Sequence, residues 1–156
     1  MRLFRFGDPG QEHPGAVLPD GTRVDCSGCG EDWNEQFFQT GGLSRLATWL
    51  EQNGSAAPVV ADGTRLGAPI CRPSKIVCIG LNYRDHAAET GTELPAEPVI
   101  FFKSTTAIVG PNDDVLLPPS STKSDWEVEL AVVVGSTLSY ADQATATNGI
   151  AGYCLH

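Results

Sequence analysis

Residues 75–89 read KIVCIGLNYRDHAAE, and this stretch decides the fold class of the chain. It opens with a short run at 75–79, apolar from Ile76 on, that is closed by Gly80, a pattern typical of a strand buried on both faces. Asn82 then stands where a helix N-cap belongs, so a helix is predicted at 84–89. A helix directly after a buried strand is the kind of junction at which mixed folds build their sites.

Further elements are predicted after this stretch, and most of them are strands. We expect strands at 98–102, at 113–117, where two prolines follow, and at 150–155. The longest strand is expected at 125–134, and Ser139 is expected to cap a short helix. The predicted fold class is therefore α+β and mainly β.

The residues before this stretch are expected to form a small separate α/β module. A strand is predicted at 1–6, a hairpin at 16–24 around an Asp-Gly turn, and a helix at 43–50, where apolar residues recur at helical spacing. Because continuous apolar runs begin after Pro73, the predicted domains are an N-terminal module at 1–72 and a second domain at 73–156. We interpret the N-terminal module as a cover or interface element.

Composition and charge exclude several classes of protein. The chain has 156 residues, 41% of them hydrophobic and 19% charged, which is typical of a globular protein. The net charge of −9 argues against binding to nucleic acid or to an anionic membrane. Because no apolar stretch could span a bilayer and the start lacks the apolar core of a signal peptide, the expected location is cytoplasmic.

Cys26 and Cys29 have the spacing of half a zinc site or of a redox pair. No second pair of Cys or His close in the sequence completes four zinc ligands. Small residues in a turn are therefore the favoured interpretation, with a zinc module as a third-ranked alternative for function. The odd count of five cysteines, without a secretion signal, predicts free thiols in a reducing compartment.

Glu127 and Glu129 form the first candidate site. Residues two apart on a strand point to the same side, which puts these carboxylates roughly 6 to 7 Å apart along the backbone. Residues 131–134 read AVVV without polar alternation, so we expect this strand to be covered on both faces. Two carboxylates near a core need a proton or a cation between them, and oxygen ligands favour Mg²⁺, Mn²⁺ or Ca²⁺ over zinc. A solvated polar face is the plainer alternative.

His86 and Glu89 form the second candidate site. Residues three apart share a helix face, so Glu89 can accept a hydrogen bond from the His86 ring and raise its basicity. An imidazole oriented by a carboxylate can take a proton from water at neutral pH, although an exposed helix pair is the plainer alternative. Lys103 ends an apolar run and could bind a substrate carboxylate, or it could be an ordinary solvated lysine.

Four segments of the second domain read KIVCIGLNYRDHAAE at 75–89, EPVIFFK at 97–103, GPNDD at 110–114 and DWEVEL at 125–130. Together and in this order they resemble the fumarylacetoacetate hydrolase family, in particular its bacterial branch of acylpyruvate and diketo-acid hydrolases. The resemblance covers residues 73–156, whereas the N-terminal module matches only loosely.

The resemblance implies a mixed β-roll or distorted barrel, here incomplete, and a homodimer. By position, Glu127 and Glu129 match the family's first two metal carboxylates, and His86 and Glu89 match its catalytic dyad. Lys103 lies in a recurrent family motif and is assigned to substrate binding. The implied metal is Mg²⁺, with Mn²⁺ or Ca²⁺ as substitutes.

The resemblance also implies a third metal ligand downstream of this chain. In family members the strand that matches 152–156 leads into an Asn-Asp-Val-Ser type segment whose Asp is that ligand. Two carboxylates alone hold Mg²⁺ weakly unless substrate oxygens help. We therefore expect a truncated reading frame, a fragment, or a subunit that another chain completes.

The implied function is metal-dependent hydrolysis of a C–C bond in a small keto-acid substrate, a 2,4-diketo acid or acylpyruvate. Glu89 would orient His86, His86 would deprotonate a water, and the metal would stabilise the released enolate. Enolate stabilisation also serves isomerases, decarboxylases and lyases, which remain alternatives within the family. A truncated non-catalytic fragment or assembly module is the alternative from another class, and it predicts no metal-dependent rise in melting temperature.

Overall fold

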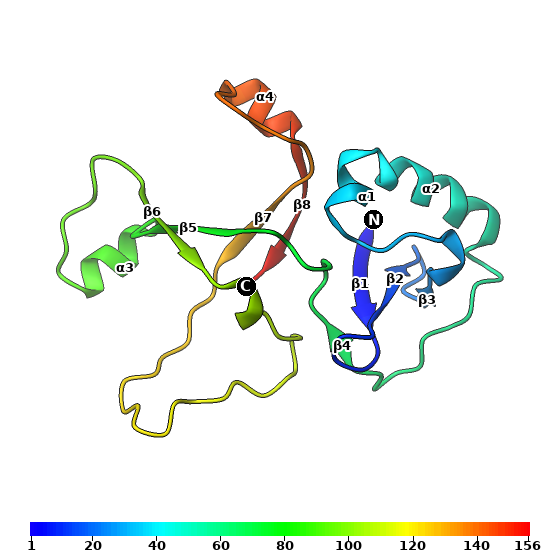
Figure 1. Cartoon of the computed structure of the whole chain (residues 1–156), viewed down its shortest axis with the longest axis horizontal. Coiled ribbons are helices and arrows are strands. Elements are labelled where there is room, and N and C mark those ends of the chain that lie inside the picture. The colour runs from blue at the N-terminus through cyan, green and yellow to red at the C-terminus, as the bar shows by residue number, and fades with distance from the viewer. The chain divides into compact units, whose positions relative to one another are not determined.

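The computed structural model describes all residues from 1 to 156 (Figure 1). The chain divides into two compact units, of which one comprises residues 1–71 and 109–156 and the other comprises residues 72–108. Each unit is described by itself below. The architecture is a mixed α/β one in which short antiparallel strand pairs predominate, without a closed barrel.

A four-stranded antiparallel sheet organises the first 67 residues, with strand order β3-β2-β1-β4. Its strands are β1 (Arg2–Phe6), β2 (His13–Val17), β3 (Arg23–Asp25) and β4 (Leu66–Gly67). The hairpin between β2 and β3 closes through the predicted Asp-Gly turn, where Gly21 has a φ of 92°. Such a backbone conformation favours glycine because a Cβ would clash with the following carbonyl.

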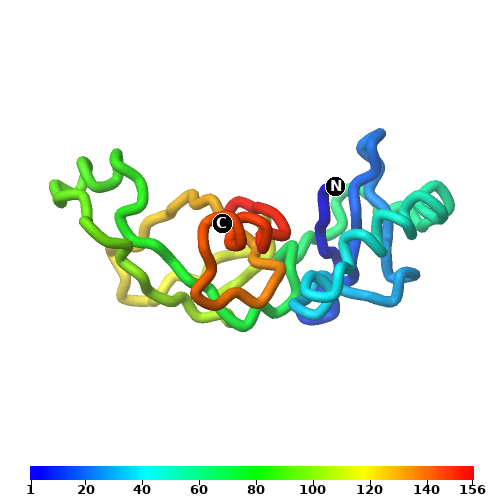
Figure 2. Tube along the Cα trace, turned by 90° about the horizontal axis from the view of Figure 1, so that it is seen from above, coloured from blue at the N-terminus to red at the C-terminus, as the bar shows by residue number.

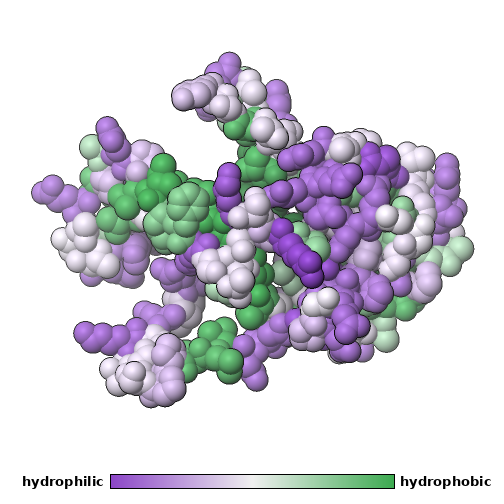
Figure 3. All heavy atoms as spheres, viewed as in Figure 1, coloured by the Kyte–Doolittle hydropathy of each residue, from purple (hydrophilic) through white to green (hydrophobic).

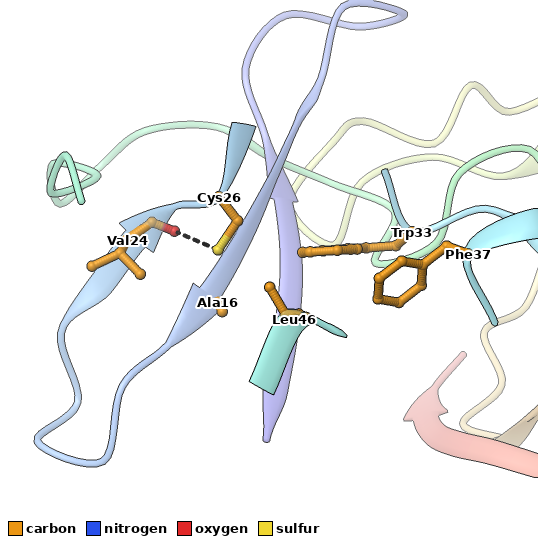
Figure 4. Packing of buried hydrophobic residues seen from close by; sticks show 6 residues of the cluster. All are labelled: Ala16, Val24, Cys26, Trp33, Phe37 and Leu46. Carbon is orange, nitrogen blue, oxygen red and sulfur yellow. Dashed lines mark hydrogen bonds between the residues drawn. The ribbon is translucent and has the colours of Figure 1, made fainter. Parts of the chain in front are cut away.

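Two helices, α1 (Glu35–Gln39) and α2 (Gly42–Asn53), pack together beside this sheet. Between sheet and helices lies the main hydrophobic core, which consists of Ala16, Val24, Cys26, Trp33, Phe37 and Leu46 (Figure 4). The indole N–H of Trp33 donates to the carbonyls of Phe4, at 2.9 Å, and Gly15, at 3.2 Å. The buried indole therefore has polar partners on both β1 and β2, as a buried tryptophan requires.

The unit at 72–108 is a two-stranded ribbon with one helix. Strand β5 (Ile76–Gly80) pairs antiparallel with β6 (Val99–Lys103), and α3 (Arg84–Glu89) lies between the two strands in the chain. A 3-10 turn, η2 (Thr105–Ala107), follows β6. The helix ends in a Schellman motif, because the amide of Thr92 donates to the carbonyl of Ala87 and Gly91 has a φ of 64°. The strands and helix predicted in this region are therefore confirmed, with starts shifted by one residue for both strands.

The last hairpin is formed by β7 (Leu130–Val134) and β8 (Ile150–Leu155), with α4 (Gln143–Asn148) between them (Figure 2). Asp142, rather than Ser139, caps α4, because its carboxylate accepts from the amide of Thr145 at 2.8 Å. An aspartate at this position suits a helix N-terminus by charge as well as by hydrogen bonding.

Some predictions about the strands after residue 75 are wrong. Residues 113–117 form no strand, because the 110–113 segment is closed into a turn instead. The second error concerns burial: β5 and β7, expected to be covered on both faces, each alternate between partly buried and exposed residues. Each of the two strands has only one partner strand, and apolar side chains of the resulting ribbons stay exposed, as Figure 3 shows in green along the β5–β6 ribbon.

Candidate functional site

Helix α3 carries the predicted dyad. His86 and Glu89 are three residues apart on this helix, so they share a face, and both are exposed. The structure shows no hydrogen bond between the His86 ring and the Glu89 carboxylate. The His86 amide is instead held by the carboxylate of Asp85 at 2.9 Å, which stabilises the first turn of the helix.

The turn that leads into α3 is backbone-strained. Leu81, between β5 and the helix, has a φ of 50°, in the left-handed region that costs a non-glycine residue about 1 to 2 kcal/mol. Tyr83, not the predicted Asn82, is the N-cap residue and makes no side-chain capping hydrogen bond. The direction in which α3 leaves the strand is therefore set by the backbone at Leu81 rather than by a cap.

Lys103 is the last residue of β6 and pairs with Ile76 at the start of β5. It is half-buried, whereas the four apolar residues before it are exposed. The ribbon thus puts the lysine at the end of β5–β6 opposite to the end from which the chain enters α3.

Glu127 and Glu129 precede β7 and do not lie inside a strand, which corrects the predicted strand at 125–134. Glu127 is exposed and Glu129 is half-buried, so the covered environment expected for them is not present in this chain. Glu129 nevertheless belongs to the ladder, because its amide donates to the carbonyl of His156 at 2.8 Å and its carbonyl accepts from the amide of His156 at 2.9 Å. In the same register, residues 125–128 would pair with positions beyond His156.

Glu127 and Glu129 supply metal donors, but they do not form a complete metal site within this chain. No group of three or more His, Cys, Asp or Glu side chains in the chain is arranged to hold a metal ion. The acids at 127 and 129 supply carboxylate oxygens, which fit a hard divalent cation in kind but provide only two donor groups. The dyad belongs to the unit at 72–108 and the two acids belong to the other unit.

Cys26 is the N-cap of a single 3-10 turn, η1 (Ser27–Cys29), and Cys29 is the last residue of that turn; both are free thiols. Burial raises the pKa of the Cys26 thiol to about 12, and it also raises the pKa of Cys29. A thiol that keeps its proton is a poor nucleophile. The two cysteines lie in a turn, as predicted, and no third His, Cys, Asp or Glu side chain is arranged with them to hold a metal ion.

An ionic network that the sequence analysis missed lies at the edge of the N-terminal sheet. Arg5 binds the carboxylate of Asp32 through Nε at 2.8 Å and lies 3.6 Å from that of Glu12. Arg65 binds Glu12 at 3.1 Å and Asp113 at 2.6 Å. The hydrogen bond from Arg65, followed by that from the Gly110 amide, holds the pKa of Asp113 below its ordinary value. The GPNDD segment was the signal available in the sequence, but nothing in it indicated a partner.

None of the helices has the length and apolar content needed to cross a bilayer.

Comparison with known proteins adds a family match over the second half of the chain. Residues 75–156 match the family model described as fumarylacetoacetate (FAA) hydrolase C-terminal. A curated relative from Burkholderia multivorans, named only as a hydrolase, is 44% identical over 155 residues, which cover 99% of this chain and 54% of the relative. The chain thus spans about half the length of the curated relatives that it matches.

Solved structures give the same coverage. Fumarylacetoacetate hydrolase from Exiguobacterium antarcticum is 27% identical with a TM-score of 0.73, over 99% of this chain and 54% of that one. Maleylpyruvate hydrolase from Sphingobium sp. SYK-6, solved in complex with manganese(II) and pyruvate, is 23% identical with a TM-score of 0.78, over 99% of this chain and 57% of that one. This second likeness concerns the fold.

Proposed function

Since the chain belongs to the fumarylacetoacetate hydrolase family, we propose that it supplies part of the active site of a metal-dependent hydrolase that cleaves a C–C bond in a 2,4-diketo acid or acylpyruvate. His86 and Glu89 would be the catalytic dyad, Lys103 would bind substrate, and Glu127 and Glu129 would be metal ligands. The observation that carries the proposal is the family match, which includes all five of these residues.

The donor chemistry supports a hard divalent cation at Glu127 and Glu129. Carboxylate oxygens are the ligands that Mg²⁺ and Mn²⁺ prefer, and the related maleylpyruvate hydrolase was solved with manganese(II) and pyruvate. When bound, the cation would polarise the oxygens of the keto acid. Glu127 and Glu129 would contribute two negative charges that hold it.

The register of β7 and β8 indicates where a third carboxylate would have to stand. Because Glu129 pairs with His156, the ladder position facing Glu127 is the second residue beyond His156. Directly opposed residues of an antiparallel pair point to the same face. An aspartate there would lie on the same face as both glutamates and would raise the number of protein carboxylates to three.

His86 would act as the general base of the reaction. A neutral imidazole would accept a proton from water, and the hydroxide would attack the carbonyl farther from the keto-acid carboxylate. The C–C bond between that carbonyl and the methylene carbon would then break, releasing a carboxylic acid and the enolate of the keto acid, which would take up the proton from the imidazolium. Glu89, one helical turn along the same face, would orient the ring and stabilise its positive charge once the proton is bound. Lys103 would neutralise the substrate carboxylate.

Acylpyruvate hydrolysis with Mn²⁺ or Mg²⁺ tests this proposal, using the chain together with a purified polypeptide that supplies the family's remaining half. We expect loss of turnover in His86→Ala and in Glu127→Gln, with Glu93→Gln, an exposed glutamate of the loop after α3, as the matched control. Unchanged hydrolysis in both site variants would overturn the proposal. Identification of the products separates hydrolysis from the isomerase, decarboxylase and lyase alternatives.

A metal titration separates the enzyme from the non-catalytic alternative. A cation that binds the folded chain raises its melting temperature in proportion to the logarithm of its concentration above Kd. We expect a rise with Mn²⁺ that disappears in Glu127→Gln. An assembly module without a metal site predicts the same melting temperature at every Mn²⁺ concentration.

A further inference from the structure

The turn at 110–113 connects two parts of the chain that the family match separates. Asp113 and Gly110 lie within the matched residues 75–156, whereas Arg65 and Leu66 lie before them. Arg65 nevertheless binds Asp113 in a bidentate manner, with Nε 2.8 Å from one carboxylate oxygen and Nη2 2.6 Å from the other. Paired hydrogen bonds of this kind fix the orientation of both groups as well as their distance.

Hydrogen bonds within the turn fix the position of the Asp113 carboxylate that binds Arg65. The Gly110 amide donates to the Asp113 carboxylate at 2.7 Å, and the Asp113 amide donates back to the Gly110 carbonyl at 3.1 Å. The carboxylate is therefore held by hydrogen bonds within its own turn as well as by Arg65. Gly110 is buried, and a Cβ at this position would lie 2.2 Å from the carbonyl oxygen of Leu66, so only a glycine permits so close an approach to β4.

Arg65 also makes hydrogen bonds to residues of the N-terminal segment. Its Nη1 donates to the Gly7 carbonyl at 2.7 Å and to the Glu12 carboxylate at 3.1 Å. One edge of the guanidinium thus binds the loop between β1 and β2, while the other edge faces Asp113. The side chains of Arg65 and Asp113 are 26% and 22% exposed, which distinguishes the pair from a solvated surface ion pair of little energetic value.

We propose that the Gly110–Asp113 turn is the docking site through which the segment 1–71 attaches to residues 109–156 of the family match, which lie in the same compact unit, and that Arg65 is the residue that recognises this turn. The partner is a segment of the same chain, and its recognition combines a bidentate guanidinium with a backbone contact at Gly110. This role explains the GPNDD motif, to which the proposed reaction assigns no task. It is independent of whether the chain hydrolyses any substrate.

Amide hydrogen exchange of the full chain, read by mass spectrometry over peptides that include residues 110–113, tests the proposal. Loss of a charged, part-buried hydrogen-bond pair is expected to raise exchange at the Gly110 and Asp113 amides about tenfold or more in Arg65→Met and in Asp113→Asn. The double variant should exchange no faster than either single one. Arg65→Lys, which keeps the charge but loses the fork, should give an intermediate rate.

Matched controls separate docking from general destabilisation. Arg45→Met removes an arginine that pairs with Glu31 inside the N-terminal segment, and exchange at 110–113 should stay unchanged. Gly110→Ala should accelerate exchange as Arg65→Met does, whereas Gly152→Ala, where a Cβ meets nothing within 4 Å, should not. The proposal is overturned if exchange at 110–113 is unaffected by Arg65→Met, or if it rises equally in Arg45→Met. Should Arg65→Met fail to fold, Arg65→Lys decides the question by the same criterion.

Discussion

Glu129 and His156 form a reciprocal backbone pair, in which each amide donates to the other's carbonyl, at 2.8 and 2.9 Å. This is the last rung of the β7–β8 ladder. Opposed residues in such a hydrogen-bonded pair have Cα atoms about 5.5 Å apart and side chains on the same face. The relationship sets the register of every position beyond it, including the position that would face Glu127.

Extension of β8 beyond His156 should therefore place an added aspartate opposite Glu127, where it can join Glu127 and Glu129 in binding a metal ion. We expect six alternating residues added after His156, with Asp at the second position, to convert 125–128 into strand and to tighten Mn²⁺ binding relative to the same extension with Asn. Electron paramagnetic resonance of free Mn²⁺ measures the affinity. Moving the Asp to the third position puts it on the opposite face and should abolish the gain; equal affinities for the two placements would contradict the register.

The positive φ of Leu81 should make this position selective for residues that tolerate a left-handed backbone. We expect Leu81→Val to reduce the free energy of unfolding by about 1 kcal/mol more than Leu81→Asn, because β-branched residues are strained at positive φ whereas asparagine is not. Urea denaturation followed by circular dichroism measures the difference. Leu94→Val, at an exposed loop leucine with an ordinary φ, is the control and should change little; identical effects of Val and Asn at 81 would contradict the explanation.

Gly15 should be indispensable for the packing of β1 on β2. A Cβ at this position would lie 2.4 Å from Cζ of the Phe4 ring, so the ring or the strand must move. We expect Gly15→Ala to destabilise the protein by about 1 to 3 kcal/mol, the usual cost of overpacking. Thermal unfolding measures the loss, and Gly152→Ala, with open space around the added methyl, should leave the midpoint nearly unchanged.

The buried Cys26 thiol should make the protein sensitive to alkaline pH. Because burial raises the pKa of this thiol to about 12 from an ordinary value of 9.0, the folded chain keeps a proton that the unfolded chain loses between these values. Its contribution to stability is fully present below pH 9 and disappears as the pH rises through about 12. Denaturation midpoints measured from pH 8 upward should fall less steeply in Cys26→Ala than in the natural chain. Parallel slopes for the two proteins would show that Cys26 does not titrate on unfolding.

Local chemistry predicted most of the individual elements. The Asp-Gly hairpin, the helical spacing before Asn53, the strand before Gly80 and the helix that ends near Gly91 all depend on short-range steric and capping effects, and all occur in the structure. The prediction of a strand at 113–117 was wrong for a short-range reason as well, because the carboxylate of Asp113 accepts a hydrogen bond from the Gly110 amide and closes a turn. The sequence could not show that this carboxylate also has a partner 48 residues away.

The amino-acid sequence by itself determined the kind of elements, the family, and the residue types available for a site, because these follow from patterns over a few neighbouring positions. Only the tertiary structure decided how far β7 extends, which faces of the ribbons stay open, and that Arg65 meets Asp113. These features depend on contacts between residues far apart in the chain. A strand can extend only as far as a paired backbone does, and an ion pair forms only where the fold brings both charges within hydrogen-bonding distance.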